Sequence, residues 1–238
     1  MRVGLGVRAV LVALALMALP AIGWAQISFN QIDTFETGST LNWGNGQGTA
    51  AVTVSAGGPL GSNDHFLSIS PGPGGRLIAF NRAQWVGNYN AAGVNAIEMD
   101  VINPSSTQIA LRVAFKVDVT SFSAGYSLTS AIVLPPAQTT WQHVVVSLAD
   151  ANFTPISSPT VPLTTLLGSP AEMRILSSAV PSLNGDAIAA TLGVDNIRAF
   201  FQPVPEPTSA LGIAVCGTGA AAVFRRRWRR AGGSCTVG

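Results

Sequence analysis

The chain has 238 residues, of which 47% are hydrophobic and only 10% are charged, and its formal net charge is +2. Ordinary soluble domains carry about 25% charged residues, so Ser, Thr, Asn and Gln must supply most of the surface polarity here. Both cysteines, Cys216 and Cys235, lie close to the C-terminus. The rest of the chain therefore has no disulfide, no thiolate nucleophile and no cysteine metal site.

The first 25 residues have the organisation of a secretory signal peptide. Arg2 and Arg8 form a basic start, and Ala9–Leu19 is an apolar run too short to span a bilayer. Small residues occupy the −3 and −1 positions before a cleavage site between Ala25 and Gln26. We predict removal of residues 1–25 after export by the Sec machinery.

Residues 26–201 alternate short apolar, β-branched runs with clusters of Gly, Pro, Asn and Ser. This spacing is typical of an all-β sandwich or barrel, and only Thr160–Leu167 suggests a helical turn. The predicted strands are Ile32–Phe35, Ala51–Ser55, Phe66–Ser70, Arg76–Phe80, Asn95–Ile102, Gln108–Val117, Ser127–Val133, Gln142–Leu148, Ala171–Ser177 and Ala190–Phe201.

The charge of this middle part differs from that of the whole chain. Between Gln26 and Pro207 there are six basic and eleven acidic residues, which leaves a net charge of −5. The basic pI of 8.8 therefore arises from the two ends. It gives no reason to expect a nucleic acid as partner.

Three segments of the middle part resemble the carbohydrate-binding type of jelly roll, the galactose-binding-like group. They are Ile32–Glu36 followed by Trp43, Gln84–Val101, and Val194–Arg198. The resemblance implies a single jelly-roll-like β-sandwich of about 8–10 strands over residues 26–201. Because this fold hosts binding, structural and enzyme accessory modules alike, the function does not follow from it.

The resemblance also implies that the first and last strands lie side by side with a structural calcium at their rim. Asp33, Glu36 and Asp195 would supply hard oxygen ligands of the kind that Ca²⁺ prefers. The alternative is ordinary polarity of edge strands and capping of turns by Asp. No other cofactor is expected.

Four aromatic residues are candidates for glycan binding, because sugars stack on exposed rings. Trp43, Trp85, Tyr89 and Tyr126 lie in or beside loop-like segments with polar neighbours. Trp141 starts an apolar strand and is expected in the core. The alternative is that the other four are also core anchors, as aromatic residues usually are.

No catalytic residue is predicted. Glu98 and Asp100 begin like the carboxylate signature of a jelly-roll glycoside hydrolase family, but Ile102 and Asn103 stand where the second catalytic carboxylate belongs. Glycoside hydrolysis requires that second carboxylate. The two histidines lack the spacing of a zinc site.

The C-terminal end has three parts in a specific order. A linker over residues 202–207 ends in Val204, Pro205, Glu206 and Pro207. The 17 uncharged residues Thr208–Phe224 form a predicted transmembrane helix of minimal length. The final segment, 225–238, carries basic residues that the positive-inside rule assigns to the cytoplasm, namely Arg225, Arg226, Arg227, Arg229 and Arg230.

This order of motif, apolar span and arginine cluster resembles the PEP-CTERM sorting tail. The resemblance implies a Gram-negative exported protein that an exosortase processes, usually alongside exopolysaccharide production. The alternative is a plain C-terminal anchor in the inner membrane without processing. In either case both ends place residues 26–201 outside the cytoplasm.

These observations lead to one expectation for function. The protein is a non-enzymatic β-sandwich that is held at the inner membrane and then released to the cell surface or an exopolysaccharide (biofilm) matrix. A specific carbohydrate-binding module is the alternative, and a glycoside hydrolase is the least favoured.

Overall fold

The structure is a computed structural model, which describes residues 26–45, 52–71, 75–120 and 123–203. Strands dominate it, with one 3₁₀ turn, η1 (Asp150–Asn152), and one helical turn, α1 (Leu163–Leu166). The strands are β1 (Ile32–Asp33), β2 (Val52–Gly58), β3 (Gly61–Ile69), β4 (Ile78–Asn81), β5 (Ala96–Ile102), β6 (Ile109–Lys116), β7 (Gly125–Leu128), β8 (Ile132–Leu134), β9 (Gln142–Ser147), β10 (Phe153–Ile156), β11 (Glu172–Ser177) and β12 (Leu192–Phe200).

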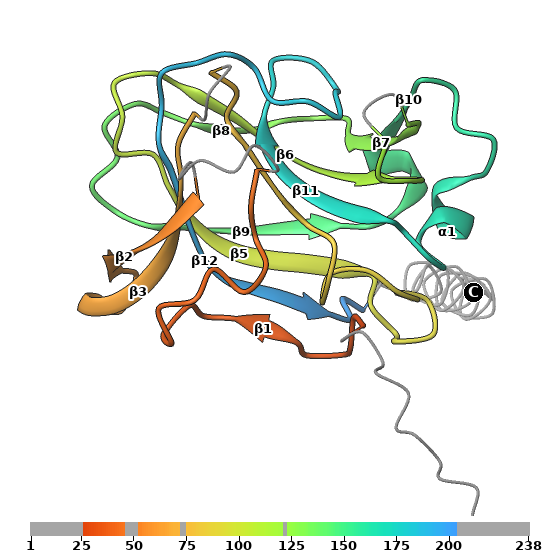
Figure 1. Cartoon of the computed structure of the whole chain (residues 1–238), viewed down its shortest axis with the longest axis horizontal. Coiled ribbons are helices and arrows are strands. Elements are labelled where there is room, and N and C mark those ends of the chain that lie inside the picture. The colour runs from red at the N-terminus through yellow and green to blue at the C-terminus, as the bar shows by residue number, and fades with distance from the viewer. Residues whose placement is uncertain (1–25, 46–51, 72–74, 121–122, 204–238) are drawn as a thin grey trace, which may run out of the picture. The chain divides into compact units, whose positions relative to one another are not determined.

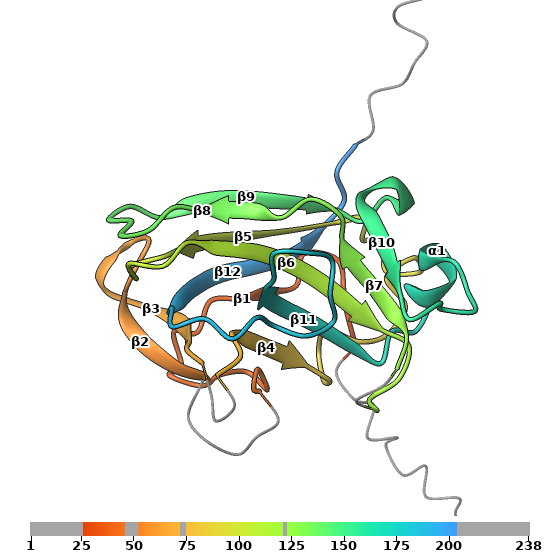
Figure 2. The same cartoon turned by 90° about the horizontal axis from the view of Figure 1, so that it is seen from above.

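Two antiparallel sheets pack face to face (Figure 1). Sheet A has the order β2-β3-β12-β5-β9, with β1 also pairing β12, and sheet B has the order β10-β7-β6-β11-β4, with β8 also pairing β6. Figure 2 shows the strands of both layers from above, with the β2–β3 hairpin at one end and α1 at the other. The predicted all-β jelly-roll-like sandwich is confirmed.

The core lies between the sheets and follows the alternation of the strands. In β6, Ile109, Leu111, Val113 and Phe115 are buried in the main hydrophobic cluster. Every second residue of a strand points to the same face, so this apolar set meets the inward residues of sheet A. The inward residues of β5 and β12 are Ile97, Met99, Val101, Leu192, Val194, Ile197 and Ala199.

The predicted strands are recovered with shifted ends, apart from two differences. The segment Ser127–Val133 forms two short strands, β7 and β8, which pair with different stretches of β6. The edge strand β10 was not predicted, because Pro155 removes a backbone donor and weakens the strand signal. The predicted helical turn within Thr160–Leu167 is present as α1.

The predictions for the two ends lie outside the described residues. They are the signal peptide up to Ala25, the motif Val204–Pro207, the apolar span Thr208–Phe224 and the arginine cluster after it. Within the described ranges, no helix has the length and apolar character needed to cross a membrane.

Candidate functional site

Two of the four aromatic residues proposed for sugar stacking are buried around one carboxylate. Trp43 and Trp85 are 2% and 0% exposed, and both indole N–H groups donate to Asp33 Oδ2, at 2.8 and 2.7 Å. Gln84 Nε2 donates to the same oxygen at 3.3 Å. Burial raises the pKa of Asp33, and these three hydrogen bonds oppose that shift. Rings enclosed in this way cannot stack on a sugar.

The two tyrosines are also engaged inside the fold. Tyr89 is fully buried, donates to the backbone oxygen of Trp85 at 2.8 Å, and meets Phe115 edge to face. Burial raises its pKa well above the ordinary value. Tyr126 is half-buried, packs against the main core and donates to the Val161 oxygen at 2.9 Å. Trp43, Trp85 and Tyr89 are therefore core anchors, which corrects their prediction as glycan-binding residues.

A different aromatic pair lies on the outer face of sheet A. Phe66 and Trp141 are half-buried and meet edge to face, with ring centroids 5.1 Å apart. They close over Gly193, where an added Cβ would lie 3.0 Å from Trp141 and 3.2 Å from Phe66. Because Leu192 and Val194 point into the core, Gly193 faces outward. The expectation that Trp141 belongs to the core was wrong.

The first and last strands lie side by side, and a gap opens where their pairing ends. β1 pairs with Ile197 and Arg198, and β3 pairs with residues 192–194 on the same side of β12. Asp195 and Asn196 fall between these two ladders, at a bulge where Asn196 has a φ of 50°. A cleft of about 610 Å³ opens here, lined by Thr34, Glu36, Leu60, Gly61, Ser62, Asn63, Asp64 and Asn196.

Asp195 is an unpaired carboxylate at this gap. It is 1% exposed, and within the described part of the chain no donor reaches either of its oxygens with ordinary hydrogen-bond geometry, the Asn196 backbone N–H being nearby. Burial raises its pKa to about 7, the nearby Asn196 backbone N–H opposes that rise, and repulsion from Asp64, Asp100 and Glu36 adds to it. A proton or a bound cation would offset the cost of burying this carboxylate.

The calcium ligands predicted from the sequence are only partly brought together. Asp33 points into the core toward the two indoles, so it does not fit the predicted site. Glu36 lines the cleft and accepts from the His65 backbone at 3.1 Å. Asp64 also lines the cleft and accepts from the Leu60 backbone at 2.6 Å. Sequence spacing offered no signal for Asp64, because only the β2–β3 hairpin brings it there.

The carboxylate oxygens at this gap are nevertheless of the kind that bind a cation. Across the described ranges, no three Asp, Glu or His side chains converge closely enough to count as a formed metal site. Among the described residues, the buried Asp195 carboxylate has no cationic partner, and the acidic side chains of Glu36 and Asp64 are its neighbours. The arrangement is an acidic cleft around an unpaired charge, and Ca²⁺ prefers such hard oxygen donors.

The carboxylates of the hydrolase-like segment are held by neighbouring groups on the outer face of sheet A. Glu98 pairs with Arg198 at 2.9 Å and lies 3.6 Å from His143. Asp100 is 3.0 Å from the His143 ring and accepts from Asn196 at 2.9 Å. Both carboxylates point to one face of β5, as the strand alternation predicts.

Neither the protein-family models nor the curated proteins that were compared match the chain. Among solved structures, an exo-β-agarase superposes with a TM-score of 0.50 at 12% identity, over 76% of this chain and 25% of the agarase. The chain thus spans about a quarter of that enzyme. At this identity the likeness shows the fold alone.

Separate carbohydrate-binding modules are also among the similar structures. One is a family 11 module from Clostridium thermocellum in complex with a β-1,3-1,4-mixed-linked tetrasaccharide, with a TM-score of 0.44, 16% identity, and coverage of 74% of this chain and 96% of the module. Another is specific for non-crystalline cellulose, with a TM-score of 0.41, 14% identity, and coverage of 74% and 97%.

Proposed function

We propose that this chain is an exported, non-catalytic β-sandwich that serves as a component of the cell surface or of an exopolysaccharide matrix. The observation that carries the proposal is the order of Val204–Pro207, Thr208–Phe224 and the arginine cluster at the C-terminus. The Sec machinery exports the chain, the inner membrane holds it briefly, and an exosortase processes the tail. Five arginines after the span keep that end in the cytoplasm until processing.

The intact mass of the native protein in membrane, surface and medium fractions tests this proposal. We expect an extracellular species that starts at Gln26 and ends within Val204–Pro207. A species confined to the membrane that still carries Arg225 and Gly238 would refute processing and leave a plain membrane-anchored domain. Replacing the five arginines by Gln is a matched control, because it removes the topology signal and keeps the Pro-Glu-Pro motif.

Specific carbohydrate binding is the second candidate. The half-exposed pair Phe66–Trp141 favours it, since sugar rings stack on aromatic faces and Trp offers a large one. Affinity electrophoresis in gels with embedded β-glucans tests it. We expect Trp141→Ala to abolish retardation and Phe29→Ala, which alters a 54% exposed aromatic residue elsewhere, to preserve it. Equal retardation of both variants would reject this pair as the platform.

A structural calcium completes the proposed function. Glu36 and Asp64, which line the cleft, and Asp195, which is buried next to Asn196 of the same lining, would hold it through carboxylate oxygens. The unpaired carboxylate of Asp195 supports this assignment, because a divalent cation would offset its burial cost and the repulsion from its acidic neighbours. The ion links the first strand to the last strand, and it has no part in catalysis.

A further inference from the structure

The two sheets differ in charge. Sheet A and its rim contain Arg198 as their one basic residue within the described ranges, against the acidic residues Asp33, Glu36, Asp64, Glu98, Asp100 and Asp195. The other five basic residues of those ranges belong to sheet B or adjoin β4, and they are Arg76, Arg82, Arg112, Lys116 and Arg174. A body with a net charge of −5 therefore concentrates its positive charge on one sheet.

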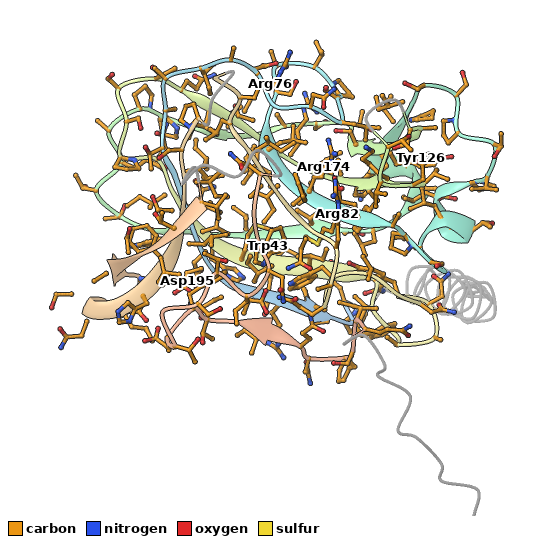
Figure 3. The ribbon with its side chains drawn as sticks, in the orientation of Figure 1. Trp43, Arg76, Arg82, Tyr126, Arg174 and Asp195 are labelled. Atoms are coloured by element: carbon orange, nitrogen blue, oxygen red, sulfur yellow. The ribbon has the colours of Figure 1, made fainter. Side chains whose placement is uncertain are left out.

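Three of these cations surround one buried carboxylate. We term these four residues the sheet B basic cluster (Arg82, Lys116, Glu172 and Arg174). Figure 3 shows Arg82 and Arg174 close together at β11, away from Asp195. Glu172 is fully buried, and it pairs with Arg174 through Oε1 and with Arg82 through Oε2, the latter at 2.5 Å. Lys116 lies opposite Glu172 in the β6–β11 ladder and donates to the backbone oxygen of Thr120.

Arg82 presents an unused edge to solvent. Its side chain is 44% exposed, and only Nε is used in the ion pair with Glu172. Within the described residues, neither terminal nitrogen of Arg82 makes a hydrogen bond. The guanidinium lies 4.4 Å from the centroid of the Phe80 ring, which restricts its orientation. The free Nη1/Nη2 edge matches the two oxygens of a carboxylate or a sulfate.

The cluster carries more positive charge than Glu172 neutralises. Burial and then repulsion from Arg174 lower the pKa of Lys116, and Arg82 adds to that repulsion, whereas Glu172 and Asp118 oppose it. Burial, with a smaller contribution from Arg82, also lowers the pKa of Arg174. Since Arg174 already pairs with Glu172, the second arginine is not needed to neutralise that carboxylate. A bound anion would relieve the remaining repulsion.

We propose that Arg82, stacked on Phe80 and backed by Arg174, binds the acidic groups of a polyanionic polysaccharide. This inference rests on the proposed matrix role, because that role supplies an extracellular polysaccharide as ligand. The site is distinct from the Phe66–Trp141 pair of sheet A, which would stack on neutral sugar faces. Carboxylate and sulfate share the chemistry that the free guanidinium edge recognises.

Affinity electrophoresis of the full chain tests the site with three gels containing polygalacturonate, dextran sulfate or a neutral β-glucan. Arg82→Gln removes the charge. Arg82→Lys retains the charge but cannot donate two parallel hydrogen bonds to one acidic group. Arg198→Gln is the matched control, because Arg198 is 40% exposed and pairs with one glutamate at 2.9 Å on the other sheet. Circular dichroism verifies that each variant is folded.

We expect Arg82→Gln to weaken binding to one or both polyanions about tenfold, the typical effect of losing a charge-assisted hydrogen-bond pair. Arg82→Lys should give an intermediate loss, and Arg198→Gln should bind like the wild type. Comparison of the two acidic gels shows whether carboxylate or sulfate is preferred. If Arg82→Gln is unstable, Arg82→Lys alone decides, since it retains the ion pair with Glu172.

Four results would overturn the inference. Equal losses in Arg82→Gln and Arg198→Gln would indicate a general charge effect. Binding to the neutral glucan alone would leave the proposed carbohydrate role intact and reject the acidic ligand, whereas absence of binding in all three gels would count against both. Concentration-dependent sedimentation that Arg82→Gln abolishes would assign the positive face to a second copy of the chain instead.

Discussion

The buried carboxylate of Asp195 should make stability fall as pH rises. Its pKa is raised from 3.8 to about 7, so between these values the folded protein binds a proton that the unfolded chain has released. Stability from this group is therefore present in acid and lost between about pH 4 and 7. At about 1.36 kcal/mol per pKa unit, the loss is at most about 4 kcal/mol.

Asp195→Asn isolates this contribution, because it keeps the shape and removes the charge. In calcium-free buffer we expect the variant to be more stable than the wild type at pH 8 and nearly equal at or below about pH 4. Urea unfolding, followed by the fluorescence of the buried Trp43 and Trp85, measures both values. Asp150→Asn, at an exposed position in η1, is the control and should leave the pH profile unchanged.

Calcium should restore the stability that the wild type loses as pH rises. At pH 8, calcium at 100 times its dissociation constant stabilises a protein with one site by about 2.7 kcal/mol, and Asp195→Asn should lose most of this gain. Persistence of the wild-type pH slope in Asp195→Asn would refute the electrostatic reasoning. Equal stabilisation of both proteins by calcium would refute the site.

Other predictions test packing and buried hydrogen bonds by urea unfolding. Gly193→Ala should cost about 1–3 kcal/mol, since its Cβ would lie 2.6 Å from a neighbouring isoleucine carbon, whereas Gly44→Ala meets nothing within 4 Å and should change stability by less than about 0.5 kcal/mol. Trp85→Phe should cost about 1–3 kcal/mol, because Asp33 loses a buried donor at 2.7 Å. An unchanged unfolding midpoint for Trp85→Phe would show that its hydrogen bond to Asp33 contributes little.

The strand pattern could be predicted because it is local. β9 lies within the predicted segment Gln142–Leu148, and its buried residues Val144 and Val146 alternate with exposed ones. Such alternation reports which face of a strand meets the core without knowledge of its partners. The same logic separates Glu98 and Asp100 from the inward residues of β5.

β1 shows where that logic fails. Alternation would place its isoleucine inward and its acid outward, yet Ile32 is 48% exposed and Asp33 is 4% exposed. The reversal depends on Trp43 and Trp85, whose indole donors come from 10 and 52 residues away. A shift of one residue exchanges the two faces of a strand. The two indole N–H groups that donate to the Asp33 carboxylate are enough to turn the acidic side chain, and not the isoleucine, toward the core.

Composition and alternation by themselves determined the all-β class and the approximate strand positions, and the resemblance to jelly rolls implied that the first and last strands lie side by side. Tertiary structure alone decided which aromatic residues are buried, that Asp195 is left unpaired, and that Arg82 and Arg174 share Glu172. The physical reason is distance along the chain. Period-two alternation can be read from consecutive residues. Burial and charge clustering depend on strand pairings that bring distant residues together, such as Arg82 with Glu172 and Asp64 with Asp195.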